Sequence, residues 1–328
     1  MKAVIVDRPG GADVLRLADV QDPVAGPDEM LIRVAAAGVN RADVLQRMGF
    51  YPPPPGASDI LGLEISGVVE VAARSGGPDA GARVVALIEG GGYAELASAR
   101  WRQVVPVPNS VDLVAAASIP EVFITAHSNL FGWGRLQSGE AVLIHGGAGG
   151  VGTAAIQLAH QRQCAVVTTA GAERKLARCR ELGADVTINH RSEDFVARVH
   201  EVTHGRGVDV ILDVMGAEYL ERNIEALAPA GRLVIIGMQG GTHADLDIAR
   251  LNRKCATVMA TQLRAQPAEQ KATLVAAFAD EVMPLIADGM VRPVVDRVLP
   301  LHDAADAHRA LESGEVIGKV LLQVNDAL

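Results

Sequence analysis

Residues 142–152 read Val-Leu-Ile-His-Gly-Gly-Ala-Gly-Gly-Val-Gly, an apolar run that breaks into glycines. Gly147, Gly149 and Gly152 have the G-x-G-x-x-G spacing of a turn that receives a dinucleotide. In such a turn the first glycine allows the bend, the second lets the backbone approach the pyrophosphate, and the third lets helix and strand pack closely. The helix that follows would offer free N–H groups to the phosphates.

A chain with 34 glycines can produce such a spacing by chance, so the prediction depends on the sequence around these glycines. Residues 141–145 are apolar and predict a buried strand. Residues 153–162 place alanine and isoleucine on one helical face, and the β-branched residues 165–169 predict a second strand. The alternative is an ordinary glycine-rich turn between a strand and a helix. The strand–turn–helix–strand context favours the dinucleotide site.

The end of the second strand bears on the choice between NAD(H) and NADP(H). A carboxylate about 20 residues past the glycines holds the ribose 2′-hydroxyl in NAD-binding proteins. Residues 168–171 are Thr-Thr-Ala-Gly, and Arg174 and Lys175 follow. A missing acid beside cations favours NADP(H), with Lys175 as the phosphate contact. The alternative is that both cations belong to the solvated face of a helix at 172–182.

The chain length predicts two domains, because 328 residues exceed the size of a single core. The pattern of predicted helices and strands indicates an α/β protein. Short strand-like runs separated by glycine and proline fill residues 1–120, and helices alternate with strands over 121–264. Such alternation is typical of a doubly wound parallel sheet. The predicted strands are 3–6, 30–36, 65–72, 83–87, 93–97, 185–188, 208–213, 232–237, 256–261, 294–299 and 319–324, and further helices are 173–182, 192–203, 217–228, 268–288 and 303–313.

Composition excludes several other classes of protein. The net charge of −9 argues against nucleic-acid or membrane partners. Three scattered cysteines without a CxxC pair fit neither a disulfide framework nor a zinc site, and they suit a reducing compartment. No apolar run has membrane-spanning length, and the first residues predict a strand rather than a signal peptide. These features lead us to expect a cytoplasmic enzyme.

Several motifs resemble one family. They are AGVNRAD at 37–43, PPG at 54–56, ILGLEISG at 60–67, IPE at 119–121, HGGAGGVGTAAIQLA at 145–159, ELGAD at 181–185, NHR at 189–191 and IGKV at 317–320. Together they resemble the zeta-crystallin-like quinone oxidoreductases of the medium-chain dehydrogenase/reductase superfamily, over essentially the whole chain. The resemblance implies a GroES-like, mostly β catalytic domain made of residues 1–120 and 265–328, with a Rossmann NADP-binding domain at 121–264 inserted in it. It also implies a cofactor cleft between the domains and a homodimer joined through the Rossmann sheets.

The resemblance also addresses the metal. Zinc alcohol dehydrogenases of the superfamily hold zinc at positions that correspond here to Asn40, Leu63 and roughly Glu121. One potential ligand out of three cannot hold zinc, and the cysteine-rich lobe of a structural zinc is missing. We therefore expect no metal. An acceptor that needs little polarisation, such as a quinone, is then favoured.

The residues that the resemblance assigns to the cofactor lie in both parts of the chain. They are Asn40, Thr125, Gly147, Gly149, Gly150, Val151, Gly152, Gly171, Lys175, His190, Met215, Gly216, Gly237, Met238, Thr261 and Leu263. Some relatives carry serine where this chain has Gly149. His190 could instead be an exposed histidine in a turn.

Asn40 and Tyr51 are the predicted catalytic residues. The Asn40 amide could hold a substrate oxygen or the nicotinamide ribose, or it could simply bond its own loop. The Tyr51 phenol, beside the prolines at 52–55, could give a proton to the reduced acceptor or only shape the pocket. Phe50 and Phe123 are the predicted apolar neighbours of the acceptor. Whether electrons pass singly or as a hydride stays open.

Two other functions remain as alternatives. Reductases of activated C=C bonds in enoyl thioesters or alkenals share the Asn-x-x-Asp…Tyr spacing, which Asn40, Asp43 and Tyr51 match. Against this reading, the cations of the N-terminal half are isolated, so no cluster suits a CoA phosphate. A non-catalytic NADPH-binding structural protein is the third hypothesis.

Overall fold

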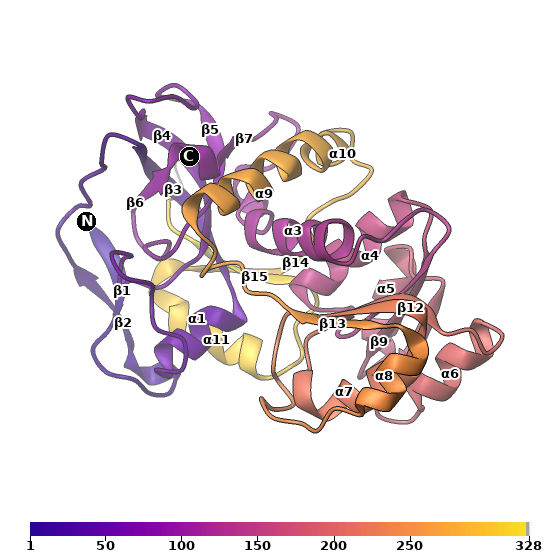
Figure 1. The fold of residues 1–328 in the computed structure, drawn as a ribbon. Helices are drawn as coiled ribbons and strands as arrows, with labels where there is room; N and C mark the ends of the chain where they lie inside the picture. The colour runs from indigo at the N-terminus through magenta and orange to yellow at the C-terminus, as the bar shows by residue number, and fades with distance from the viewer. Residues whose placement is uncertain (326–327) are drawn as a thin grey trace. The chain divides into compact units, whose positions relative to one another are not determined.

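The computed structural model describes residues 1–325 and 328. The chain forms two compact units. The split unit comprises Met1–Ile124 and Leu263–Leu328, and the inserted unit comprises Thr125–Gln262. Both chain ends therefore belong to the split unit, where Figure 1 marks them.

The inserted unit is built on a six-stranded sheet in the order β10-β9-β8-β11-β12-β13, in which every pairing is parallel. Its strands are β8 (Ala141–Ile144), β9 (Ala165–Ala170), β10 (Val186–Asn189), β11 (Val208–Asp213), β12 (Leu227–Ile235) and β13 (Thr257–Ala260). Numbered along the unit, this order is 3-2-1-4-5-6, the Rossmann arrangement. The predicted doubly wound sheet is confirmed.

Helices cover this sheet between the strands (Figure 1). They are α4 (Gly150–Gln161), α5 (Glu173–Glu181), α6 (Phe195–Val202), α7 (Leu220–Ala226) and α8 (Ile248–Lys254). The predicted helix 192–203 begins three residues late, because the Asp194 carboxylate caps it by accepting from the N–H of Val196. The predicted helix 217–228 begins as the 3₁₀ turn Gly216–Tyr219 and ends before β12, which starts earlier than the predicted strand 232–237.

The split unit contains a seven-stranded sheet in the order β14-β15-β3-β4-β5-β7, with β6 paired to β3, and a separate hairpin of β1 and β2. Its strands are β1 (Lys2–Val6), β2 (Leu15–Asp19), β3 (Glu29–Val39), β4 (Glu64–Val71), β5 (Arg83–Leu87), β6 (Leu96–Arg100), β7 (Val104–Pro106), β14 (Val295–Pro300) and β15 (Lys319–Gln323). Its helices are α1 (Arg41–Arg47), α2 (Leu113–Ala116), α9 (Ala268–Glu281), α10 (Met283–Ala287) and α11 (Ala304–Glu312), while α3 (Pro120–His127) begins in it. The C-terminal β15 pairs antiparallel with β3.

Two sequence predictions for this unit were wrong in detail. The strand expected at 93–97 forms three residues later as β6, because Ala94 makes only an isolated bridge with Ala3. The single helix expected at 268–288 is α9 followed by α10, with a break at Val282. Pro284 has no N–H to donate into α9, and it occupies a first-turn position of α10 instead.

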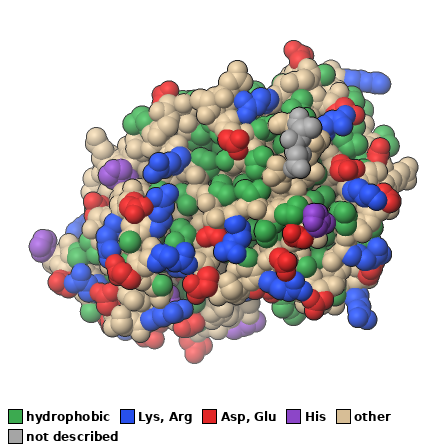
Figure 2. Space-filling model, turned by 180° about the vertical axis from the view of Figure 1, so that it is seen from behind, with side chains coloured by type: hydrophobic (Ala, Val, Ile, Leu, Met, Phe, Trp, Pro, Cys, Tyr) green, Lys and Arg blue, Asp and Glu red, His purple; other side chains and the backbone are tan. Residues whose placement is uncertain are grey.

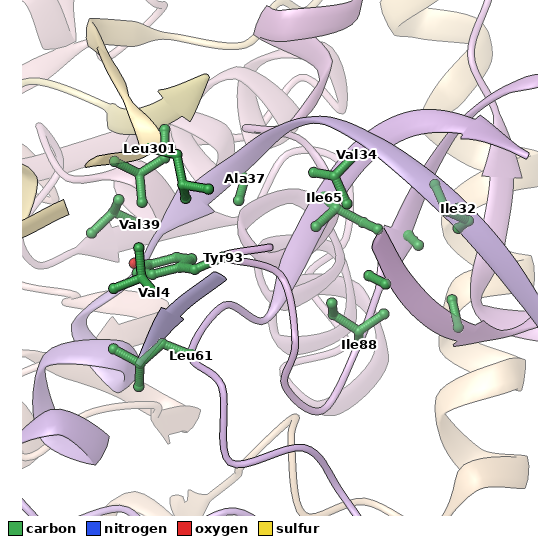
Figure 3. Close-up of a cluster of buried hydrophobic side chains, with 14 of the residues drawn as sticks. Val4, Ile32, Val34, Ala37, Val39, Leu61, Ile65, Ile88, Tyr93 and Leu301 are labelled. Atoms are coloured by element: carbon green, nitrogen blue, oxygen red, sulfur yellow. The ribbon is translucent and has the colours of Figure 1, made fainter. Parts of the chain in front are cut away.

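The hydrophobic cluster around Tyr93 in the split unit is mainly aliphatic, and the Tyr93 phenol is buried in it. Figure 3 shows the ring of Tyr93 among side chains that include Val4, Val39 and Leu61, and all four residues are at most 1% exposed. Because a buried phenol needs a hydrogen-bond partner, the surroundings of the Tyr93 hydroxyl become part of the site described below.

The surface and the helix lengths carry two further observations. On the face shown in Figure 2, acidic and basic side chains are interspersed rather than gathered by sign. Over residues 1–325 and 328, none of the helices combines the length and the hydropathy required to cross a bilayer.

Candidate active site

The glycine turn joins β8 to α4 in the inserted unit. Gly146, with φ of +68°, is its left-handed residue, so the bend lies one position earlier than the sequence suggested. A methyl group at Gly147 would overlap the hydroxyl of Thr168 on β9, and one at Gly152 would come within 2.6 Å of the Gly147 Cα. Gly149 has open space around it, with Gly146 O the nearest atom at 3.4 Å. The turn therefore needs glycine at 147 and 152 for packing, and at 149 it leaves room for a ligand.

Residues 150–152 begin α4, a helix of 12 residues whose first N–H groups have no intrahelical partner. Gly149 is its N-cap, with extended backbone and no side chain to satisfy those donors. A pyrophosphate would accept from the N–H groups of Gly150, Val151 and Gly152 and would meet the positive end of the helix dipole.

The end of β9 and the loop after it, residues 168–171, carry no carboxylate and lie close to cations. A methyl group at Gly171 would lie 2.9 Å from His190 Nε2 and 3.1 Å from Arg191 Nε. Burial, followed by the charge of Arg191, lowers the pKa of His190, and the charge of Lys175 on α5 acts in the same direction. The structure thus brings Gly171, His190 and Lys175 to one end of the sheet, and it adds Arg191, which the sequence analysis did not single out. This set suits a ribose 2′-phosphate.

The loops after β11 and β12 lie against each other at two of the predicted cofactor residues. A methyl group at Gly216 (φ +74°) would be 2.9 Å from Gly241 O and 3.2 Å from Gly237 O. The Asp213 carboxylate accepts from the N–H groups of Met215 and Gly216 at 2.9 and 2.8 Å, which fixes the first loop. Met238, by contrast, is 63% exposed.

Asn129 links two more predicted cofactor residues, and no sequence signal identified it. Its amide donates to Thr125 O at 2.8 Å and accepts from the Thr261 hydroxyl at 2.6 Å. Leu263 follows β13 along the chain and is the first residue after the inserted unit, so it belongs to the split unit. The predicted cofactor residues of the inserted unit thus gather at the carboxyl ends of its strands, where ligands bind in sheets of this kind.

In the split unit, a buried polar centre surrounds Asn40. The residue is the N-cap of α1 and forms a capping box with Asp43. Its side-chain amide donates to Glu64 Oε1 at 2.9 Å and accepts from Lys319 Nζ at 2.6 Å. Lys319 also donates to Val39 O at 2.8 Å and pairs with Glu64 Oε1 at 2.7 Å. The Asn40 amide is therefore held from both sides.

The second oxygen of Glu64 accepts from the N–H of Glu121 at 2.8 Å. Gly38 makes room for the carboxylate, because a methyl group there would lie 2.6 Å from Glu64 Cδ. Burial, and then the negative charge of Glu64, raises the pKa of Glu121 to about 8. At neutral pH the Glu121 carboxyl is therefore mainly protonated, and its O–H group can donate a hydrogen bond.

The donor set at this centre does not fit zinc. Leu63 is apolar and 1% exposed, and Asn40 has its amide oxygen bonded to an ammonium group. Lys319 Nζ lies within 2.8 Å of three oxygens and so takes the place where a cation would bind. Among residues 1–325 and 328, no three histidine, cysteine or carboxylate side chains gather as a metal site. The residues themselves thus support the sequence argument against zinc.

A hydrogen-bonded chain continues from Asp43 to the surface. The Asp43 carboxylate accepts from the N–H groups of Asn40 and Gly62 and from the Tyr93 hydroxyl, at 2.8, 3.1 and 3.2 Å. Tyr93 contacts His308 Nε2 at 3.2 Å, and burial lowers the pKa of His308 to about 3, so this ring is neutral. Burial raises the pKa of Asp43 to about 6.

The far end of this chain is an ion pair. Arg47, 1% exposed, contacts His308 Nδ1 at 3.3 Å and makes two bonds to the Glu312 carboxylate, at 2.8 and 2.9 Å. Apart from Asp43, which the sequence analysis named for its spacing from Asn40 and Tyr51, these residues were not predicted, because their contacts join segments far apart along the chain.

Tyr51 lies in the loop after α1. The guanidinium Cζ of Arg264 is 5.4 Å from the centroid of its ring. Of the other two residues predicted for the acceptor pocket, Phe50 is 73% exposed and Phe123 is 1% exposed. Phe123 is therefore a core residue here, and the prediction that it lines a pocket has no support in its burial.

Family models match both parts of the chain. The alcohol dehydrogenase GroES-like domain matches residues 26–109, and the zinc-binding dehydrogenase model matches residues 150–280. The first match lies within the split unit, and the second begins at the end of the glycine turn and covers most of the inserted unit. Together with the strand order, they confirm the predicted combination of a GroES-like domain with a Rossmann sheet.

Known proteins are similar over nearly the full chain. A phenolphthiocerol/phthiocerol polyketide synthase of Mycobacterium tuberculosis is 34% identical over 97% of this chain, which spans 14% of that protein's length. The quinone oxidoreductase of Lama guanicoe is 31% identical, with 98% of this chain and 97% of that protein covered. The crystal structure of Escherichia coli quinone oxidoreductase complexed with NADPH matches with a TM-score of 0.89 and 28% identity, over 99% of this chain and 100% of the other. The chain belongs to the quinone oxidoreductase family of the medium-chain dehydrogenase/reductase superfamily.

Proposed function

We propose that this protein is an NADP(H)-dependent oxidoreductase that reduces quinones without a metal. The observation that carries the proposal is the ammonium group of Lys319, which occupies the polar centre at 2.6 Å from Asn40 Oδ1 and 2.7 Å from Glu64 Oε1. With a fixed ammonium there, no Lewis acid can polarise an alcohol or a simple carbonyl. A quinone needs no such help, because its reduced form is aromatic.

The preference for NADP(H) rests on the end of β9, where Lys175 and Arg191 are the cations, His190 is a hydrogen-bonding neighbour whose lowered pKa keeps its ring neutral, and residues 168–171 include no carboxylate. The NADPH complex of the similar Escherichia coli quinone oxidoreductase agrees with this preference. The pyrophosphate would lie on the first turn of α4, at Gly149 to Gly152. Bound NADPH supplies a hydride, or electrons one at a time, to the acceptor.

The chain's own residues orient the acceptor and supply the proton. Tyr51 is the proposed proton donor, since its phenol lies on a loop of the split unit beside Arg264. Asn40 acts as a fixed hydrogen-bonding residue whose amide direction Lys319 and Glu64 determine. Glu121, protonated at neutral pH, is a second source of a proton in the same polar centre.

The test is oxidation of NADPH by the purified protein with an ortho-quinone and an enoyl-CoA in parallel, and with NADH as the alternative donor. The expected result is faster turnover of the quinone than of the enoyl-CoA, with a much higher KM for NADH than for NADPH and no change after treatment with a chelator. Elemental analysis that finds stoichiometric bound zinc would contradict the proposal.

A second candidate is reduction of an activated C=C bond. Similarity to the polyketide synthase favours it, and so does the spacing of Asn40, Asp43 and Tyr51. In that case the enoyl-CoA is the faster substrate and Tyr51→Phe abolishes its turnover. Tight NADPH binding with no turnover of quinones, enoyl thioesters or alkenals would instead favour a structural NADPH-binding protein.

We also propose a homodimer joined through the inserted unit. Strand β13 is one of the two edges of its sheet, the other being β10, and Leu246 and Ile248 nearby in sequence are 38% and 67% exposed. Light scattering of the purified protein measures the mass directly. A mass that falls to that of one chain when Ile248 is replaced by Asp would support this interface.

A further inference from the structure

Arg264 is a buried cation in the segment that joins β13 to α9, and the motifs did not reveal it. It is 6% exposed, and its Nε and Nη2 both donate to the backbone carbonyl of Glu89, the former at 2.9 Å. The Glu89 carboxylate pairs instead with Lys271, whose ammonium group also donates to Arg264 O at 3.1 Å. Glu89 and Lys271 thus hold the guanidinium in one position, while the Glu89 carboxylate makes its ion pair with Lys271.

The third nitrogen of this guanidinium, Nη1, is buried and has no hydrogen-bond partner among residues 1–325 and 328. The aromatic ring of Tyr51 is 5.4 Å from its Cζ. The titratable groups that interact with Arg264 electrostatically also include the carboxyls of Asp43, Glu121 and Glu89. Burial lowers the pKa of Arg264, while these groups and Tyr51 raise it. Within the described part of the chain these carboxyls make no hydrogen bond to the guanidinium, and the ring of Tyr51 is among the groups on which its positive charge acts.

We propose that Arg264 is a positioning residue for Tyr51, which holds the phenol ring in place and stabilises the phenolate. The inference rests on the proposed function, in which Tyr51 donates the proton. A guanidinium packs well on an aromatic face, and a positive charge within about 4–6 Å favours the ionised form of an acid.

The proton balance of the step is simple. Two bonds would form on the acceptor, one to the hydride and one to the proton. The hydride's C–H bond would break on bound NADPH, which would become NADP⁺, and the proton's O–H bond breaks on Tyr51. The phenolate left beside Arg264 recovers a proton from water. Arg264 keeps its own protons throughout, as its chemistry requires.

Ultraviolet absorbance of tyrosine ionisation, recorded without cofactor or acceptor, tests the proposal directly. The chain has three tyrosines, and burial raises the pKa of both Tyr93 and Tyr219. Tyr51→Phe identifies the transition that belongs to Tyr51. Arg264→Met should move this transition to higher pH by about one unit, and Arg264→Lys should restore part of the shift.

Arg102→Met is the matched control, because it also removes a guanidinium that lies over a ring of the split unit. Its Cζ is 5.8 Å from the Trp101 ring, and its side chain is 52% exposed. This variant should leave the Tyr51 transition unchanged. An Arg264→Met or Arg264→Gln protein that is folded by circular dichroism and ionises Tyr51 at the wild-type pH would overturn the proposal.

Turnover gives a second and separable readout. In Arg264→Met the part of the pH profile of kcat/KM that depends on Tyr51 should shift to higher pH, as the absorbance transition does. The KM for NADPH should stay within about twofold of the wild-type value. If the absorbance shift occurs and no quinone is reduced, the proposed function is wrong and the pairing of Arg264 with Tyr51 stands. If neither the absorbance transition nor the pH profile shifts, the pairing of Arg264 with Tyr51 is refuted.

Discussion

Removal of the Lys319 ammonium group is the perturbation that most directly tests the polar centre. Lys319 and Glu64 are 4% and 0% exposed, and their charged atoms are 2.7 Å apart. With an effective dielectric constant of about 20, two unit charges at that distance attract by about 6 kcal/mol. Loss of solvation offsets part of this attraction. Breaking a buried pair by removing one partner costs about 3–5 kcal/mol, because the remaining charge stays buried.

We therefore expect Lys319→Met to lower the free energy of unfolding of the split unit by about 3–5 kcal/mol. Urea denaturation followed by tryptophan fluorescence measures it. The chain has two tryptophans, Trp101 in the split unit and Trp133 in the inserted unit, so a Trp133→Phe background makes Trp101 the reporter. Combining Lys319→Met with Glu64→Gln removes both charges and should recover about 1–3 kcal/mol of the loss.

A Lys319→Met protein whose unfolding free energy stays within about 1 kcal/mol of the parent would refute this reasoning. It would mean that water reaches Glu64, and that the centre is not the dry, fixed arrangement on which the proposed metal-free reaction rests. The same variant should bind no zinc, since Leu63 and the Asn40 amide remain poor ligands.

Three further predictions concern the cofactor turn and a carboxyl group. Gly147→Ala, whose methyl group would overlap Thr168, should lower the free energy of unfolding and weaken NADPH binding by at least about tenfold in a fluorescence titration. Gly149→Ala has room in the unliganded turn and should leave the free energy of unfolding nearly unchanged, but its methyl group enters the space left for the pyrophosphate and should also weaken NADPH binding. Lys175→Ala should raise the KM for NADPH by about tenfold and leave that for NADH unchanged in steady-state assays. The pKa of Glu121 rises from 4.5 to about 8 on folding, so the stability it contributes is fully present below pH 4.5 and is lost as the pH rises to about 8. Glu121→Gln should abolish that part of the pH dependence in urea titrations, and parallel curves for both proteins would contradict it.

The sequence predicted the inserted unit well, because its information is local. The glycine turn, the β-branched strand at 165–169 and the alternating helices each follow from a short window, and the sheet order follows from the topology of such units. The errors lie at ends that a side chain sets, such as the cap of α6 by Asp194. Another error concerns the position of the turn: the left-handed backbone conformation is at Gly146 rather than at Gly147.

The polar centre of the split unit was only partly predictable. Asn40 and Asp43 form a local capping box, which their spacing in the sequence suggests. Lys319 is 279 residues from Asn40, and the contact exists only because β15 pairs with β3, with Val320 opposite Val39. Arg264 and Glu89 meet across 175 residues. Periodicity cannot report such contacts, because they depend on sheet register rather than on neighbours in the chain.

The ammonium group at the polar centre also bears on which reaction the chain can catalyse. A metal ion would exchange ligands and accept a substrate oxygen, whereas Lys319 has Asn40, Val39 and Glu64 as partners for its three protons. A cation with all its donors occupied cannot activate an alcohol, so proton donation must come from other groups. Glu121 is protonated at neutral pH, and Tyr51 lies beside a guanidinium. Of the two glutamates at the centre, Glu64 thus holds the lysine in place and Glu121 keeps a proton. This division suits the proposed acceptor, which needs a hydride and a proton but no Lewis acid.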